Sequence, residues 1–215
     1  MAEAWAKKAV EGFKFCPKFF RSISHYKRLK GAEEVTEAFL YIMNSFGNNL
    51  GPCFLQLPDN FTPSKFNDLE NFLKLLPTDI QVAVELRHTG WFTDDQVADE
   101  LFNMMKENSK ALVITDTAGR RDCVHQRLTN NLAFIRFNGY DLHQSDFQRM
   151  DEWIEKIINR KHDLNRALKN NYMNHPEPVE ENWNWDRRGR DWIYSKWLYE
   201  TRIDDLYLLK KIFVD

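Results

Sequence analysis

The stretch DIQVAVELRHTGW, residues 79–91, decides the fold and holds the densest group of reactive side-chain types in the chain. It begins as an apolar run rich in β-branched residues, which indicates a buried strand. Glu85, Arg87 and His88 follow at its carboxyl-terminal end, and a Thr-Gly turn then leads to Trp91, which we expect to be exposed. In α/β folds, ligands bind where parallel strands leave the sheet. The stretch therefore predicts a parallel sheet with a site at its edge.

The same residues also have a structural interpretation. Glu85 and Arg87 lie two residues apart, on one face of the predicted strand, where they can neutralise each other as an ion pair. His88 stands beside a turn, where its ring can hydrogen-bond the backbone. The sequence leaves the functional and the structural interpretation open.

Length and composition indicate a globular protein with one sizeable domain. The chain has 215 residues, and its 43% hydrophobic and 29% charged residues are ordinary values for such a protein. A net charge of -2 gives no overall attraction to nucleic acid or to an anionic membrane. No run approaches the roughly 18 apolar residues of a membrane span, and the amino-terminal segment lacks the apolar core of a secretion signal. We expect no membrane partner.

Cysteine usage favours a reducing compartment. Cys16, Cys53 and Cys123 are far apart and form neither a CxxC unit nor a disulfide framework. Together with the absence of a signal sequence, this predicts a cytoplasmic protein.

Strands and helices alternate along the first 158 residues. Apolar runs predict strands over 12–18, 50–58, 79–86, 111–116 and 132–140. Helical spacing of apolar residues predicts helices over 33–46, 62–76, 93–105 and 146–158. The unit of strand, polar loop and helix thus occurs about five times, which implies a parallel sheet, as in a barrel or a doubly wound fold.

Polar side chains gather at the carboxyl-terminal ends of all five predicted strands. This distribution is more typical of a barrel rim than of a single crevice. The residues are Lys18, Gln56, Glu85 with Arg87, Asp116, and Arg136 with Asn138.

From about residue 159 the character of the sequence changes. Apolar strand-like runs stop, and four of the seven Trp residues lie in the last quarter of the chain, at positions 183, 185, 192 and 197. We expect residues 1–158 to form the barrel-like part and 159–215 a divergent tail, helical or irregular. Apolar residues between 192 and 209 fit an amphipathic helix.

Five stretches carry a family resemblance: GFKFCPKFFRSISHYKRL, LGPCFLQLPDNF, VAVELRHTGWF, ALVITD and AFIRFNGY. Their sequences, order and spacing resemble the YecE-like proteins, the domain-of-unknown-function 72 family. The resemblance covers residues of about 3 to 158 and implies a TIM-type α/β barrel. The family has no established activity, so the resemblance implies an architecture and a rim site without a reaction.

From the resemblance we expect the chain to be incomplete relative to that family. The resemblance implies about five of eight βα units, with two strands absent before Met1 and the last one replaced by an unrelated tail. Two interpretations fit: a truncated product with open sheet edges, or a remodelled protein whose Trp-rich tail covers the gap. Barrel strands need both neighbours for their hydrogen bonds, which favours the fragment.

Three residues are candidates for catalysis. Glu85 has the chemistry of a base, a metal ligand or a hydroxyl acceptor. His25, in the loop after the first strand, is suited to proton transfer, although capping the next helix is an equal alternative. Asp116 is the third candidate. A metal site from these three and His88 is chemically allowed, but without a diagnostic spacing we predict no metal and assign no cofactor.

Cationic and aromatic side chains interleave on the predicted rim. Arg side chains bind phosphate as forks and aromatic rings stack on bases or sugars, whereas a solvated rim is the structural alternative. We predict a hydrolase-type enzyme acting on a phosphorylated or polyhydroxylated substrate. The alternatives are a non-catalytic binder of a phosphate-bearing ligand or single-stranded nucleic acid, and an inactive fragment. The ligand-binding candidates are Lys18, Gln56, Arg87, His88, Trp91, Arg136 and Asn138.

Overall fold

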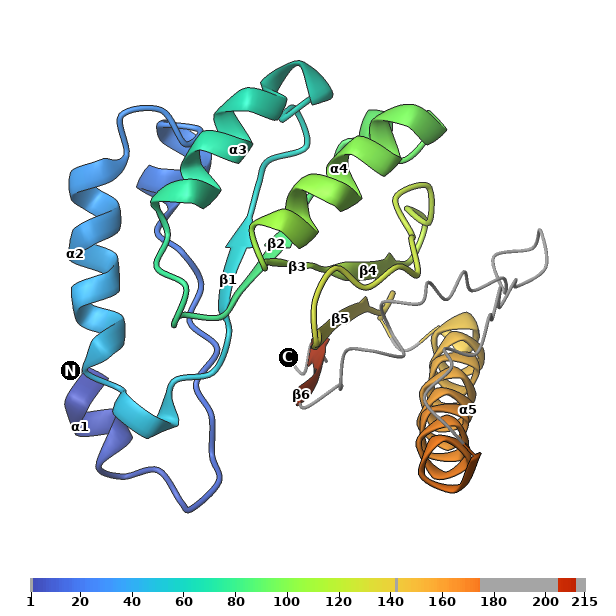
Figure 1. Cartoon of the computed structure of the whole chain (residues 1–215). Helices are drawn as coiled ribbons and strands as arrows, with labels where there is room; N and C mark the ends of the chain where they lie inside the picture. Colours follow the sequence, from blue (N-terminus) through green and yellow to red (C-terminus); the bar gives the residue numbers. More distant parts are fainter. Residues whose placement is uncertain (1, 142, 175–204, 212–215) are drawn as a thin grey trace. The chain divides into compact units, whose positions relative to one another are not determined.

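The chain folds into two compact units, residues 1–113 and 114–215 (Figure 1). The computed structural model describes residues 2–141, 143–174 and 205–211. Each unit holds a three-stranded sheet, and every strand pairing in both sheets is parallel. The expectation of an α/β fold with parallel sheets is confirmed.

Unit 1, residues 1–113, has the strand order β1-β2-β3. The strands are β1 (Cys53–Gln56), β2 (Val82–Glu85) and β3 (Ala111–Leu112). The α-helices are α1 (Ala2–Ala6), α2 (Glu33–Asn44), α3 (Phe66–Leu75) and α4 (Asp95–Glu107). Short helical turns lie between them: η1 (Ser22–Tyr26), η2 (Gly47–Asn49), η3 (Pro63–Lys65) and η4 (Thr89–Trp91).

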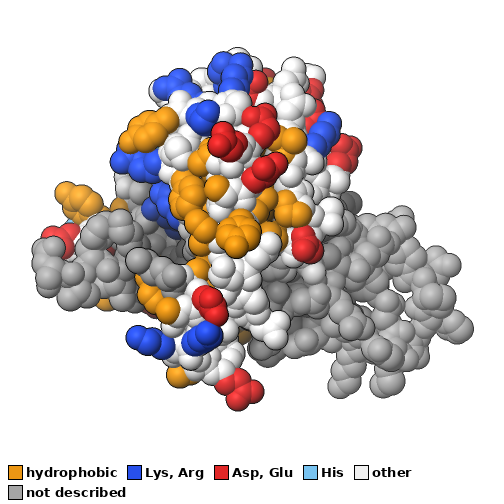
Figure 2. All heavy atoms as spheres, turned by 90° about the vertical axis from the view of Figure 1, so that its left-hand side faces the viewer, with side chains coloured by type: hydrophobic (Ala, Val, Ile, Leu, Met, Phe, Trp, Pro, Cys, Tyr) orange, Lys and Arg blue, Asp and Glu red, His pale blue; other side chains and the backbone are white. Residues whose placement is uncertain are grey.

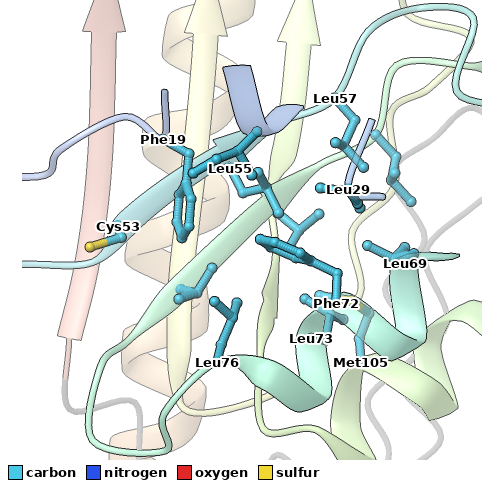
Figure 3. Packing of buried hydrophobic residues seen from close by; sticks show 14 of the residues in the cluster. Phe19, Leu29, Cys53, Leu55, Leu57, Leu69, Phe72, Leu73, Leu76 and Met105 are labelled. Carbon is cyan, nitrogen blue, oxygen red and sulfur yellow. The ribbon is translucent and has the colours of Figure 1, made fainter. Parts of the chain in front are cut away.

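One side of the unit 1 sheet packs against the helices. Alternation along β1 points Leu55 and Leu57 into a buried cluster with Leu69 and Phe72 of α3, as Figure 3 shows. Burying each such side chain contributes about 1.5–3 kcal/mol. Gln56 lies on the opposite side of the sheet, away from the helices, and its side chain belongs to the site described below.

The face of unit 1 that carries α2 is not uniformly polar. Figure 2 views the side that carries α2 in Figure 1 and shows hydrophobic side chains among the charged ones. Tyr41 and Ile42 of α2 and Trp5 of α1 are among the exposed large hydrophobic residues. Scattered exposure of this kind is normal for protein surfaces.

Two predicted strands of the first unit are shorter than expected. Residues 12–18 make only two parallel bridges, from Phe15 to Leu50 and from Lys18 to Phe54. Pro17 has no N–H to donate to a ladder, although its carbonyl accepts from the Phe54 N–H at 2.7 Å. The predicted strand 111–116 is interrupted at Val113. Residues 111–112 belong to the sheet of unit 1, and residues 114–117 belong to the sheet of unit 2.

Unit 2 has the strand order β4-β5-β6. The strands are β4 (Ile114–Thr117), β5 (Leu132–Asn138) and β6 (Asp205–Lys211), and α5 spans Gln144–Asn174. Ile135 and Phe137 of β5 form a buried cluster with Trp153 of α5. The helix therefore covers the side of the sheet to which the odd-numbered residues of β5 point.

The carboxyl-terminal part differs from the expected tail. Helix α5 confirms the predicted helix over 146–158 but continues to Asn174. An amphipathic helix over 192–209 is wrong for its last residues, because 205–211 form β6 and pair with β5. That pairing satisfies backbone groups along the β5 edge. The four Trp residues at 183–197 lie outside the described residues. No described helix combines the length and the apolar character needed to cross a membrane.

Candidate functional site

A chain of three polar side chains forms the centre of the candidate site in unit 1. Gln56 and Glu85 are register partners on β1 and β2. The Gln56 Nε2 donates to Glu85 Oε2 at 2.8 Å, and the Lys18 Nζ donates to Gln56 Oε1 at 2.6 Å. The Gln56 amide therefore links an ammonium group to a carboxylate.

Burial decreases along this chain. Glu85 is 0% exposed and Gln56 is 7% exposed, whereas Lys18 is exposed to solvent. The Lys18 ammonium also lies 5.7 Å from the centre of the Phe54 ring. The buried carboxylate thus holds an amide, and the amide holds the exposed cation at the strand end.

Arg87 lies two residues beyond Glu85 and has an acidic partner from another loop. Its Nε lies 2.9 Å from Asp59 Oδ1, in a pair whose side chains are 40% and 54% exposed. Asp59 follows β1, so the pair connects the ends of two neighbouring strands. Asp59 carries no motif that would have identified it in the sequence. Pairing between Glu85 and Arg87 stays a prediction.

His25 lies in a cationic environment on the π-helical turn η1. Its Nδ1 is 2.8 Å from Ser24 Oγ. Burial lowers the pKa of His25 first, and the positive charges of Lys18, Arg21 and Arg87 lower it further, while Asp59 opposes them. The position of His25 at the rim stays a prediction.

Two other predicted ligand-binding residues have structural contacts. His88 Nδ1 accepts from the Gly90 N–H at 3.0 Å, which confirms the structural interpretation of this ring. Trp91 is 0% exposed, and its Nε1 donates to the Phe61 carbonyl at 2.7 Å. The expected exposure of Trp91 is wrong, because the η4 turn directs the indole into the core, where its N–H finds a partner.

Asp116 lies in unit 2 and faces helix α5. It is 0% exposed, and its Oδ1 accepts from Arg149 Nη1 at 2.6 Å. Its Oδ2 accepts from Trp153 Nε1 at 2.8 Å. Arg149 also donates to Asp146 Oδ1 at 2.7 Å. The contacts assign Asp116 to the attachment of α5, and sequence reasoning missed both Arg149 and Trp153 as its partners.

Arg136 and Asn138 lie on the other side of the unit 2 sheet, away from α5. In the register of β4 and β5, Thr115 stands beside Arg136 and Thr117 beside Asn138. Asn138 Nδ2 donates to Thr117 Oγ1 at 2.8 Å. Both predicted residues are half-buried at the carboxyl-terminal end of β5.

The residues weighed for a metal site are divided between the two units. Within the described ranges, no three His, Cys, Asp or Glu side chains are arranged to hold a metal ion. His25 and Glu85 belong to unit 1, whereas Asp116 belongs to unit 2 and binds Arg149.

Comparison with known proteins gives a family match over most of the chain. Residues 1–178 match the model of a family described as "Protein of unknown function DUF72". The UPF0759 protein YecE of Escherichia coli strain K12 is 29% identical over 171 residues, covering 71% of this chain and 63% of that protein. The YecE protein of Escherichia coli O157:H7 matches with the same values. The chain thus spans less than two thirds of the length of these relatives.

Solved structures of two DUF72 proteins share the fold. The protein EF0366 from Enterococcus faecalis V583 has a TM-score of 0.61 at 24% identity, covering 72% of this chain and 70% of that one. The protein TM1631 from Thermotoga maritima MSB8 has a TM-score of 0.55 at 19% identity, covering 72% and 65%. The family match extends beyond residue 158, where the sequence suggested an unrelated tail.

Proposed function

Because the chain belongs to the DUF72 family, whose description names no function, we propose its role from the site: unit 1 binds a phosphate-bearing small molecule. The observation that carries the proposal is the placement of two cationic side chains at the ends of neighbouring strands: Lys18 bonds Gln56 of β1, and Arg87, two residues beyond β2, pairs with Asp59. Cations that cluster at the carboxyl-terminal ends of parallel strands suit phosphate recognition. Parallel strands with helices on one side of each sheet also support a TIM-barrel-like arrangement, which we retain as a proposal.

The cationic groups have partners that a phosphate can replace. The exposed pair of Arg87 with Asp59 contributes at most about 1 kcal/mol, because solvent screens it. Lys18 has three N–H donors, of which Gln56 accepts one in the bond described. A phosphate therefore gains charge-assisted hydrogen bonds at a small cost in existing contacts.

Glu85 acts as a positioning residue in this proposal. Its carboxylate is completely buried and receives the Gln56 amide N–H. This bond fixes the amide so that its oxygen faces Lys18. The role of Glu85 is therefore to place the Lys18 ammonium.

A hydrolytic reaction is the second candidate, and His25 favours it. Its lowered pKa keeps the imidazole neutral near pH 7, the form that accepts a proton from an attacking water. We assign hydrolysis of a phosphorylated substrate to this residue, with binding by Lys18 and Arg87. A non-catalytic binder would have the same cationic rim without turnover.

Calorimetric titration with inorganic phosphate tests the binding proposal. Lys18→Gln and Arg87→Gln should each weaken binding roughly tenfold or more, because each removes a charge-assisted hydrogen bond of about 1.5–3 kcal/mol. Lys74→Gln is the matched control, since Lys74 pairs with Glu70 on the surface of α3. If Lys18→Gln and Arg87→Gln bound phosphate as tightly as Lys74→Gln and the wild type, the rim would not be the phosphate site.

Turnover separates the two candidate functions. Phosphate release from p-nitrophenyl phosphate should stop in His25→Gln while phosphate binding persists. Turnover that is unchanged in His25→Gln would disprove the catalytic assignment. Tight, strongly salt-dependent binding of single-stranded DNA by the wild-type chain would instead favour a nucleic-acid binder.

A further inference from the structure

The side of the unit 2 sheet away from α5 carries a compact polar cluster. Ile114 and Asp116 of β4 point towards α5, so Thr115 and Thr117 point the other way. The parallel register places Thr115 beside Arg136 and Thr117 beside Asn138. Four polar side chains thus share one side of two neighbouring strands, close to their carboxyl-terminal ends.

Thr115 is the unusual member of this cluster. The residue is only 8% exposed, and among the described residues its Oγ1 has no hydrogen-bond partner. Buried hydroxyl groups in folded proteins are nearly always hydrogen-bonded, because losing water without a replacement is costly. A hydroxyl held in this way is ready to bond an incoming group.

The neighbouring side chains supply both donors and an acceptor. Asn138 Nδ2 donates to Thr117 Oγ1, which keeps the Thr117 hydroxyl proton available as a donor. The same bond directs the amide nitrogen of Asn138 to Thr117 and leaves its Oδ1 as an acceptor. Arg136 adds a guanidinium group suited to a planar anion. Thr117, Arg136 and Asn138 are half-buried, so part of each residue is accessible to solvent.

We propose that Thr115, Thr117, Arg136 and Asn138 form a binding site for a small polyhydroxylated carboxylate, such as a sugar acid. Arg136 and the Thr115 hydroxyl bind the carboxylate, and Asn138 Oδ1 accepts from a ligand hydroxyl. The guanidinium of Arg136 matches the single charge of a carboxylate, and the acceptor Asn138 Oδ1 requires a donor, which the hydroxyl groups of the ligand supply. The proposal rests on residues of unit 2 and does not depend on the phosphate site proposed for unit 1.

Calorimetric titration of the full chain with gluconate tests this site. Thr115→Val removes the hydroxyl and keeps the shape, so it should weaken gluconate binding roughly tenfold or more. The same substitution should raise the melting temperature without ligand, because it removes an unbonded polar group. Thr115→Ser retains the hydroxyl and should retain binding.

Thr36→Val is the matched control, since the Thr36 Oγ1 on α2 of unit 1 is also buried without a partner among the described residues. It should raise the melting temperature and leave gluconate binding unchanged. Lys18→Gln should likewise leave gluconate binding unchanged, which separates this site from the phosphate site. Loss of gluconate binding in Lys18→Gln would overturn the assignment to unit 2.

Ligand controls test the chemical class. Glucose lacks the carboxylate and butanoate lacks the hydroxyls, so both should bind more weakly than gluconate. Absence of gluconate binding, or equal binding by wild type and Thr115→Val, would overturn the proposal. Butanoate binding as tight as gluconate would also overturn it, because the acceptor Asn138 would then have no part in recognition.

Discussion

Two completely buried carboxylates, Glu85 in unit 1 and Asp116 in unit 2, stand at the carboxyl-terminal ends of comparable strands and have different surroundings. Glu85 lies on the side of its sheet away from the helices and receives an amide N–H from Gln56. Asp116 lies on the helix side and receives N–H groups from Arg149 and Trp153 of α5. Similar positions in sequence thus lead to a rim contact in one unit and a helix attachment in the other.

The difference comes from strand alternation. In β2, Val84 joins the buried cluster under the helices, so Glu85 points away from them. In β4, Ile114 joins the cluster beside α5, so Asp116, two residues later, points towards the helix. A one-residue change in phase exchanges these roles. Functional assignment of an acid at a strand end therefore needs the phase of its strand.

The largest expected effect comes from Asp116→Asn. The substitution removes the negative charge that Asp116 presents to Arg149 and Arg121, while Asp146 still pairs with Arg149, so the free energy of unfolding should fall by roughly 1.5–3 kcal/mol. Urea unfolding followed by far-UV circular dichroism gives the loss, and hydrogen exchange of the α5 amides locates it in unit 2.

Asp122→Asn provides the control in the same unit, because Asp122 pairs with Arg120 in a pair whose side chains are about half exposed. Its effect should stay below about 1 kcal/mol. If Asp116→Asn were as mild as this control, Asp116 would not attach α5, and its candidacy as a catalytic residue would return.

A smaller effect is expected for Glu85→Gln. The Gln56 amide can still bond the new side chain, so the free energy of unfolding should fall by about 1–2 kcal/mol. Phosphate affinity should fall as well, because the new amide can donate as well as accept and therefore no longer fixes the orientation in which Gln56 presents its oxygen to Lys18. Both quantities are measured on the same protein, by urea unfolding and by calorimetry.

Glu100→Gln is the matched control, since Gln96 Nε2 donates to Glu100 Oε1 at 3.0 Å in an exposed position on α4. The chemical change and the bonded pair are the same, and only the burial differs. We expect a change within about 0.5 kcal/mol for this variant. A phosphate affinity that is unchanged in Glu85→Gln would contradict the positioning role of Glu85.

The helices and their caps were the part of the fold most accessible to sequence reasoning. The sequence predicts a helix over 93–105, and at the start of α4 the Asp94 Oδ1 accepts from the Val97 N–H. Such signals are local, because capping and helical periodicity depend on residues three or four positions apart. The prediction of a parallel sheet rests on the same local patterns, repeated along the chain.

The direction of side chains was less accessible. The apolar run around Val84 has hydrophobic residues on both sides of the strand, as is usual for parallel strands, and so carries no mark of phase. Trp91 follows a turn in the sequence, and only the position of the Phe61 carbonyl shows that its indole is buried. The role of Asp116 depends on its contact with Arg149. That contact cannot be inferred from the sequence without knowing that α5 packs on β4 and β5.

The smallest expected effect concerns His25, on the turn η1 of unit 1. Its pKa is lowered in the folded chain from the usual 6.5, so between the two values the unfolded chain binds more protons. Stability is therefore complete above pH 6.5 and declines as the pH falls through that value. The free energy of unfolding is measured from pH 8 to 5 for the wild type and for His25→Gln. As the pH falls, the wild type should lose stability relative to the variant.

Sulfate sharpens this last test, because it is a dianion that does not titrate between pH 5 and 8. Bound near Lys18 and Arg87, it should raise the pKa of His25 and reduce the acid-side decline. Affinity for sulfate should accordingly increase as the pH falls, since binding and protonation of His25 favour each other. A relative stability of the wild type that rises on acidification without sulfate would place the His25 pKa above 6.5. The pKa of His25 would then not be lowered in the folded chain, and His25 would lose its support as a base near pH 7.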